Sequence, residues 1–182
     1  MPAQTADEVL EFWFAESTRP SWFARSEAFD ALVRAKLGPL HERAVLGELD
    51  AWAADPRGAL ALVLLLDQAP RNLHRGSARS FASDAAALRL ARAVVDAGLD
   101  QGLSEVEKVF LYLPFEHSES LADQDRCLAL TAGLGDPLWH NFAVKHREII
   151  ARFGRFPHRN AVLGRESTAE ELEFLKQPGS GF

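Results

Sequence analysis

Cysteine is almost absent from this sequence of 182 residues: Cys127 stands alone, which excludes an intrachain disulfide. Lysine is also scarce, with four lysines against sixteen arginines. Long apolar runs are missing, because the longest, residues 59–66, is far shorter than a bilayer crossing requires. The N-terminus has neither the basic start nor the apolar segment of a signal peptide. Together these absences predict a cytoplasmic protein that does not interact with membranes.

Charge is distributed unevenly along the chain. A net charge of −6 argues against a general binder of nucleic acids or anionic membranes. Residues 145–165 nevertheless carry six basic side chains and one acidic side chain, a local charge of +5, so the remainder sums to −11. This segregation indicates an anionic ligand or an acidic partner within the protein.

Apolar residues recur with helical spacing along nearly the whole chain, and none of the segments alternates with the period of two that is typical of strands. The apolar content of 47% is that of a globular protein. We therefore expect an all-α fold of stacked antiparallel helical hairpins, with an irregular bundle as the alternative. One domain is expected over residues 1–176, followed by a flexible tail over residues 177–182.

Capping residues mark where several helices begin. Thr5 and Ser26 each precede a segment with helical spacing, and Ser167 or Thr168, with Glu170 or Glu171, is expected to cap a last short helix. The pairs Asp55-Pro56 and Asp136-Pro137 each place a capping aspartate before a proline at the first helical position. These signals predict the starts of five helices.

Prolines are expected to limit three helices, because proline removes a backbone donor and clashes with the preceding turn. Pro39 is expected to kink or split one long helix. The helix that contains residues 60–66 is expected to end near Pro70, and a later helix at Pro114. Since residues 60–66 are apolar on every side, that helix is expected to be central.

A first polar cluster, residues 67–75, follows this apolar helix directly. Asp67 and Gln68 are expected at the C-terminal end of the helix, where an acidic group opposes the helix dipole and needs a cationic neighbour such as Arg71. We expect Asp67 to be buried and bonded to Arg71 or Arg159. A purely structural alternative is that Asp67 and Arg71 pair while Asn72 caps a turn.

A second cluster, residues 114–119, contains Glu116 and His117 after an apolar helix. Histidine titrates near neutrality and burial raises the pKa of a glutamate, so both are candidates for proton transfer. The alternative is an ordinary helix start, with Ser118 as the cap and Glu119 in the first turn.

A third cluster, residues 152–165, mixes arginines with phenylalanines, glycines and a proline. Its candidate site residues are Arg155, His158, Arg159 and Asn160. Guanidinium groups bind carboxylates and phosphates through paired hydrogen bonds and stack on aromatic rings, which Phe153 and Phe156 could supply. The alternative is a buried ion pair in which Arg155 or Arg159 binds Asp67 or Glu116.

Other chemistries lack a signature. The histidines, aspartates and Cys127 match no zinc-binding spacing, and the chain has no phosphate-binding loop, dinucleotide fingerprint or nucleophile elbow. His146 lies four residues after Phe142 and is interpreted as a core histidine rather than a ligand. No metal and no cofactor are therefore predicted.

Three motifs resemble one family of bacterial proteins, domain of unknown function 924. The first comprises residues 65–72, LLDQAPRN, with residues 78–84; the second is residues 111–119, LYLPFEHSE; the third is residues 152–168, which begin RFGRFPHRN. The resemblance extends roughly from Ala6 to Leu175. It implies an all-helical superhelix similar to tetratricopeptide repeats, and it implies no activity.

Two functions remain open on these grounds. In the first, the polar clusters converge on a small anionic molecule, a carboxylate or a phosphate, and the protein is either a binder or an enzyme. Its ligand-binding residues are Asp67, Gln68, Arg71, Asn72, Arg155, Arg159 and Asn160, and its candidate acids and bases are Glu116, His117 and His158. In the second, the same residues line the concave surface of a scaffold that binds an acidic peptide.

Overall fold

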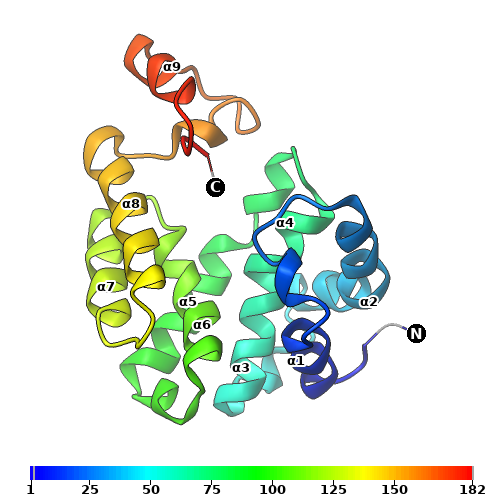
Figure 1. The fold of residues 1–182 in the computed structure, drawn as a ribbon. Coiled ribbons are helices and arrows are strands. Elements are labelled where there is room, and N and C mark those ends of the chain that lie inside the picture. The colour runs from blue at the N-terminus through cyan, green and yellow to red at the C-terminus, as the bar shows by residue number, and fades with distance from the viewer. Residues whose placement is uncertain (2, 182) are drawn as a thin grey trace. The chain divides into compact units, whose positions relative to one another are not determined.

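The computed structural model describes Met1 and residues 3–181, and these residues form helices and turns without a strand, as predicted. Figure 1 labels the α-helices in chain order. They are α1 Ala6–Phe14, α2 Glu27–Val45, α3 Pro56–Val63, α4 Ala69–Leu73, α5 Asp84–Asp96, α6 Glu105–Glu116, α7 Leu121–Thr131, α8 Pro137–Phe153 and α9 Ala169–Leu175. None of the described helices combines the length and apolarity that a membrane crossing needs.

The capping residues predicted from the sequence begin their helices as expected. Thr5 accepts a hydrogen bond from the backbone N–H of Glu8, whose carboxylate in turn accepts from the Thr5 N–H. Thr168 and Glu171 form the same reciprocal pair at α9. Asp55 caps α3, which begins at Pro56. These interactions satisfy N–H groups that lack an intrahelical partner.

Prolines do not end helices where the sequence analysis expected. Helix α2 runs through Pro39 without a break over 19 residues, and α6 runs through Pro114. At Pro70 the helix passes into α4 through one π-helical turn, Leu64–Gln68, in which the N–H of Ala69 donates to the carbonyl of Leu64. The wider turn accommodates the missing N–H of Pro70 without interrupting the helix.

Two carbonyls in the π turn accept hydrogen bonds from side chains. Nδ1 of His41 lies 2.8 Å from the carbonyl oxygen of Leu65, and Oγ of Ser83 donates to that of Leu66 at 2.5 Å. Pro70 would be the π-helical partner of Leu65 and the α-helical partner of Leu66, and it has no N–H to donate. Side chains from α2 and from the start of α5 supply the missing donors.

The chain divides into two compact units. The first, called unit 1, contains residues 1–75 and 79–114, and the second, unit 2, contains residues 76–78 and 115–182. In unit 1 the central helix is α3, whose residues Gly58 to Val63 are all buried, as predicted. Helices α1 and α5 both contact α3, and α2 packs against α4. Whether residues 1–176 fold as one domain stays a prediction.

Aromatic packing closes one end of unit 1. The ring of Phe110 in α6 lies 4.8 Å from that of Trp22 and 5.4 Å from that of Phe14, both edge-on. Trp13, which is fully buried, also meets Phe110 edge-on at 5.7 Å. Edge-to-face contacts of this kind are the favoured geometry for aromatic pairs.

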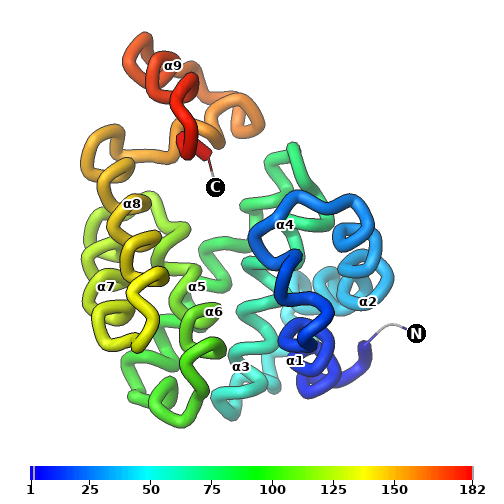
Figure 2. Tube along the Cα trace, viewed as in Figure 1, coloured from blue at the N-terminus to red at the C-terminus, as the bar shows by residue number. Residues whose placement is uncertain are grey.

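Unit 2 is built on the hairpin of α7 and α8, which lie side by side in Figure 2 and contact each other along their lengths. Helix α7 begins at Leu121 after its cap Ser120, not at Ser118. Ile149, Ile150 and Phe156 form a small apolar core, against which two further phenylalanines pack. The superhelix that resembles tetratricopeptide repeats stays a prediction.

The segment after α9 forms turns over the residues that the structure describes. The N–H of Gln177 donates to the carbonyl of Phe174, and that of Ser180 to Gln177. A methyl group built on Gly181 would lie 3.5 Å from Cβ of His158, so the segment reaches the third polar cluster. Phe182, the last residue of the expected flexible tail, lies outside the described residues.

Gly58 is required where α3 approaches the preceding turn. A Cβ atom there would lie 2.0 Å from the carbonyl oxygen of Trp52, which is backbone and cannot rotate away. We expect Gly58→Ala to lower the free energy of unfolding in urea by about 3 kcal/mol or more, at the upper end for overpacked sites.

The control for this substitution is Gly102→Ala, because a Cβ atom at Gly102 meets nothing within 4 Å. Its free energy of unfolding should differ from that of the wild type by less than about 1 kcal/mol. Equal stabilities of the two variants would contradict the close approach at Gly58.

Candidate functional sites

The first polar cluster is assembled around Asp67, whose side chain is completely buried in unit 1. Oδ2 of Asp67 accepts a hydrogen bond of 2.6 Å from Nε2 of Gln68, and Oδ1 lies 3.4 Å from Nη1 of Arg71. The same Nη1 donates to the backbone carbonyl of Asp67. The predicted burial of Asp67 and its pairing with Arg71 are thereby confirmed.

Arg71 has a second carboxylate partner that the sequence analysis missed. Its Nη1 and Nη2 donate to the two oxygens of Asp84 at 2.9 and 3.0 Å, and its guanidinium lies 5.6 Å from the centre of the Phe81 ring. Burial opposes the charge of Arg71, but the carboxylates of Asp67 and Asp84 outweigh it and raise the pKa. The two acids and one base thus form a compact ionic group.

The structural alternative expected Asn72 to cap a turn, but the structure places it within a helix. It lies in α4 and donates at 2.8 Å to Oδ1 of Asp30 on α2. Arg75 binds the same carboxylate through Nε and Nη2 at 2.8 and 2.7 Å. These hydrogen bonds, led by that from Arg75, lower the pKa of Asp30. Asn72 and Arg75 therefore join α4 to α2.

The second polar cluster supplies a buried carboxylate and imidazole in unit 2. Oε1 of Glu116 lies 3.2 Å from Nδ1 of His146, with side-chain exposures of 8% and 6%. The same Nδ1 lies 2.9 Å from the carbonyl of Phe142, so it carries the proton and Nε2 carries the lone pair. The thiol of Cys127 lies 4.0 Å from Oε2 of Glu116, and burial and this carboxylate raise its pKa.

His146 is a buried histidine, as predicted, but it belongs to the polar cluster that the sequence analysis assigned to Glu116 and His117. Burial, together with the nearby charges of His117, His158 and Arg159, lowers the pKa of His146 to about 3, although the hydrogen bond to Phe142 acts in the opposite direction. The imidazole is therefore neutral at pH 7.

Part of the third polar cluster packs around the fully buried ring of Phe156. The guanidinium of Arg159 lies 4.5 Å from the centre of this ring, and its Nη2 donates to the carbonyl of His117 at 3.0 Å. The imidazoles of His146 and His158 each lie 5.7 Å from the same ring. Unit 2 therefore brings together Glu116, His117, His158 and Arg159 from the predicted set.

Arg155 and Asn160 belong to a separate ionic group. Nε and Nη2 of Arg155 donate to the two oxygens of Glu171, at 2.7 and 2.8 Å, which lowers the pKa of this buried carboxyl to about 2. Asn160 donates to Glu171 at 3.4 Å and to Ser167 at 3.0 Å, and accepts from Arg165. This arrangement fastens α9 to the preceding loop.

Glu119 forms the companion clamp. Its oxygens accept from Nη1 and Nη2 of Arg165 at 2.7 and 2.9 Å, and Oε1 also accepts from the N–H of Phe156. Burial acts against the charge, yet the bonds from Arg165 and Phe156 lower the pKa of Glu119. Charge alternation along the sequence could have suggested a partner for Arg165, but nothing in the sequence selects Glu119.

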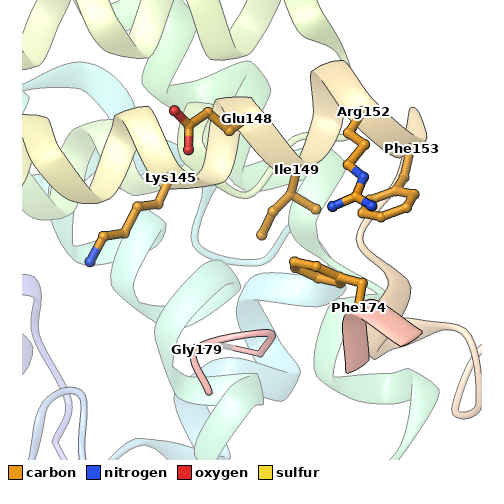
Figure 3. Close-up of a pocket in the computed structure, with 7 residues that line it drawn as sticks. All are labelled: Lys145, Glu148, Ile149, Arg152, Phe153, Phe174 and Gly179. Atoms are coloured by element: carbon orange, nitrogen blue, oxygen red, sulfur yellow. The ribbon is translucent and has the colours of Figure 1, made fainter. Parts of the chain in front are cut away.

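A surface hollow of about 210 Å³ lies at another place on unit 2. In Figure 3 the rings of Phe153 and Phe174 and the guanidinium of Arg152 gather on one side, and Lys145 projects from α8 on the other side. Glu148, Ile149 and Gly179 complete the lining. Of these residues, the sequence analysis named only Phe153, as a ring on which an arginine could stack, and none of them was selected as a ligand-binding or catalytic residue.

The predicted residues are divided between the two units. Unit 1 contains Asp67, Gln68, Arg71 and Asn72, whereas unit 2 contains Glu116, His117, Arg155, His158, Arg159 and Asn160. Their convergence on one ligand stays a prediction. Within the described residues, one further group has the composition of a metal site: His41, Glu42 and His74 in unit 1.

The family of bacterial proteins of unknown function designated DUF924 matches residues 9–179. The chain belongs to this family. A protein of unknown function from Agrobacterium tumefaciens, ATU0120, has a similar solved structure, with a TM-score of 0.89 and 42% sequence identity. The match covers 94% of this chain and 96% of that protein. No curated protein matches the chain.

Removing the buried carboxylate of Asp67 should be costly. In Asp67→Ala, Gln68 loses the carboxylate to which it donates and Arg71 keeps Asp84 as its carboxylate partner, so we expect a loss of about 3 kcal/mol in the free energy of unfolding, at the lower end for a broken buried pair. Asp125→Ala is the control, because Asp125 is 53% exposed and pairs with Arg147 at the surface. Urea melts in which both variants lose less than about 1 kcal/mol would contradict this role.

The neutral state of His146 should be visible in the dependence of stability on pH. The unfolded chain binds a proton at this position below pH 6.5, whereas the folded chain does so only near pH 3. Stability should therefore fall as the pH drops below 6.5, by up to about 1.4 kcal/mol per pH unit from this residue.

This contribution can be isolated with His146→Leu, which has no proton to take up. Between pH 6.5 and 4.5 the free energy of unfolding of the variant should fall less steeply than that of the wild type, since carboxylates contribute to both slopes equally. Parallel slopes would show that His146 ionises in the folded protein as it does in the unfolded chain.

Proposed function

We propose that the chain binds a small anionic molecule, a carboxylate or a phosphate, at the cluster around Phe156 in unit 2. The observation that carries the proposal is the buried Glu116–His146 pair, 3.2 Å apart, beside a buried arginine and two further imidazoles. Apolar packing of a helical hairpin requires none of these groups. Concentrations of titratable side chains with altered pKa values are typical of functional sites.

The charges around Phe156 favour an anion. Arg159 stacks on the ring, and the cationic forms of His117 and His158 lie close enough to depress the pKa of His146. Arg159 and His158 belong to the basic region of residues 145–165, whereas the whole chain has a net charge of −6. A bound anion would reduce the positive potential at His146 and raise its pKa.

Proton transfer to a bound molecule would use the neutral imidazole of His146 together with the candidates from the sequence. Its Nδ1 is fixed as a donor by the carbonyl of Phe142 and by Glu116, so Nε2 is the nitrogen that accepts. An imidazole held by a carboxylate resembles the orientation of histidine in catalytic triads. Glu116, His117 and His158 would supply the remaining acids and bases.

The surface hollow favours a second candidate, a scaffold that binds an acidic peptide. Its phenylalanines offer an apolar contact for one side chain of the peptide, and Lys145 and Arg152 offer charges for an acidic neighbour. Arg152 already binds Glu170 at 2.7 Å, with both side chains about half exposed, so a peptide carboxylate would replace an exchangeable surface partner.

Arg159→Gln tests the first candidate. At constant ionic strength, low millimolar phosphate should raise the melting temperature of the wild type and leave that of the variant unchanged. Binding to the folded state alone stabilises it by about 2.7 kcal/mol at a hundredfold excess over the dissociation constant. Differential scanning fluorimetry measures the shift.

The matched control is Arg152→Gln, which removes an arginine from the hollow and leaves the Phe156 cluster intact. It should keep the phosphate-dependent shift of the wild type. If only Arg152→Gln lost the phosphate-dependent rise in melting temperature, the anion would bind at the hollow, and the peptide scaffold would be supported. Equal shifts in all three proteins would indicate the general stabilisation that excluded salts produce, and would contradict the proposal.

A further inference from the structure

We propose that His41, Glu42 and His74 of unit 1 bind a divalent transition-metal ion, with Zn²⁺ as the best fit. One ligand atom from each residue lies within 4.8 Å of the others. His41 and Glu42 come from α2, and His74 is the residue that ends α4, the helix packed against α2. Two imidazoles and one carboxylate form a ligand set found in zinc sites that keep a fourth position for water or substrate.

His41 is already oriented as a ligand. It is buried, with 4% of its surface exposed, and its Nδ1 faces the carbonyl oxygen of Leu65 at 2.8 Å. A carbonyl oxygen only accepts, so Nδ1 bears the proton and Nε2 bears the lone pair. Metal-binding histidines commonly donate their second nitrogen to a carbonyl in this way. The Leu65 carbonyl is available because Pro70 leaves it without a helical donor.

His74 supplies the observation that calls for a ligand. Its Nε2 is buried and has no hydrogen-bond partner among the residues that the structure describes. Burying a polar nitrogen without a partner is unfavourable, and coordination to a metal would satisfy it. Burial, with Arg79 and His41 nearby, lowers the pKa of His74, so the ring is neutral at pH 7 and can coordinate without first losing a proton. The two imidazole rings lie 5.6 Å apart, centre to centre.

Glu42 is the movable ligand. Its side chain is 58% exposed and pairs with Arg79 at 3.1 Å. In a tetrahedral site with bonds of about 2.0 Å, ligand atoms lie roughly 3.3 Å apart, so the ligand atoms, now within 4.8 Å of one another, must close by up to about 1.5 Å. An exposed glutamate can make this movement, and Arg79, whose side chain is 63% exposed, can leave.

Sequence spacing could not reveal this group. His41 and Glu42 are adjacent, and His74 follows only after α3 and the π turn, so no short motif joins them. The expectation that the chain has no metal site rested on such motifs alone. Packing of α4 against α2 brings the three residues together.

The test is titration of the EDTA-treated full chain with Co²⁺ and Zn²⁺. We expect Co²⁺ to bind at one equivalent with the visible absorption bands of a four-coordinate ion, and Zn²⁺ to displace it. His74→Gln should weaken Zn²⁺ binding by more than about 100-fold, the upper range for loss of a mere outer-shell partner. His140→Gln, in unit 2, should bind as the wild type does.

The Zn²⁺ affinity of Arg79→Ala distinguishes binding at His41, Glu42 and His74 from nonspecific binding at the protein surface. Because Arg79 competes for Glu42 and repels a cation, its removal should tighten Zn²⁺ binding, whereas Glu42→Gln should weaken it. Circular dichroism of each variant establishes that it is folded. Absence of the Co²⁺ bands, or Zn²⁺ affinities that are equal in the wild type, His74→Gln and Arg79→Ala, would overturn the proposal.

Discussion

The missing N–H of Pro70 is the constraint on which the organisation of unit 1 depends. Proline at this position widens the central helix into a π turn and leaves the carbonyls of Leu65 and Leu66 without helical donors. His41 and Ser83 supply the hydrogen bonds instead. The lost backbone hydrogen bonds are thus replaced by two connections, from the π turn to α2 and to the N-cap of α5.

The same turn places Asp67 where it is fully buried, and a buried carboxylate is stable only with partners. Arg71 meets this demand from the next turn of the same helix and extends to Asp84 at the start of α5. Unit 2 uses arginines similarly: Arg155 and Arg165 bind Glu171 and Glu119 through paired hydrogen bonds. The planar guanidinium group presents two parallel donors to the two oxygens of a carboxylate. The ammonium group of a lysine cannot make this bidentate contact.

What the sequence could predict was local. The caps at Thr5, Ser26 and Asp55 depend on neighbouring residues, so their identity in the sequence was sufficient. The continuation of the helix through Pro70 was not predictable, because side chains distant in the sequence compensate for the lost backbone hydrogen bonds.

Long-range partners were equally beyond the sequence. Arg155 was assigned a ligand or a partner among Asp67 and Glu116, whereas the structure pairs it with Glu171. Glu171 was expected only as one of two candidate capping residues, beside Glu170. It fulfils that role as well as binding Arg155, because a carboxylate has enough acceptor sites for both. His146 was correctly interpreted as buried, but its contact with Glu116 arises from the packing of helices distant in the sequence.

The two proposed sites share one structural device and differ in their neighbours. In each unit a buried histidine turns Nδ1 toward a backbone carbonyl, Leu65 for His41 and Phe142 for His146, which leaves Nε2 as the accepting nitrogen. At His41 the surroundings are a carboxylate and a second, neutral imidazole, which suit a cation. At His146 they include Arg159 and two more imidazoles, which suit an anion. Identical orientation of one side chain can therefore serve ligands of opposite charge, because the groups around the imidazole decide which ligand is stabilised.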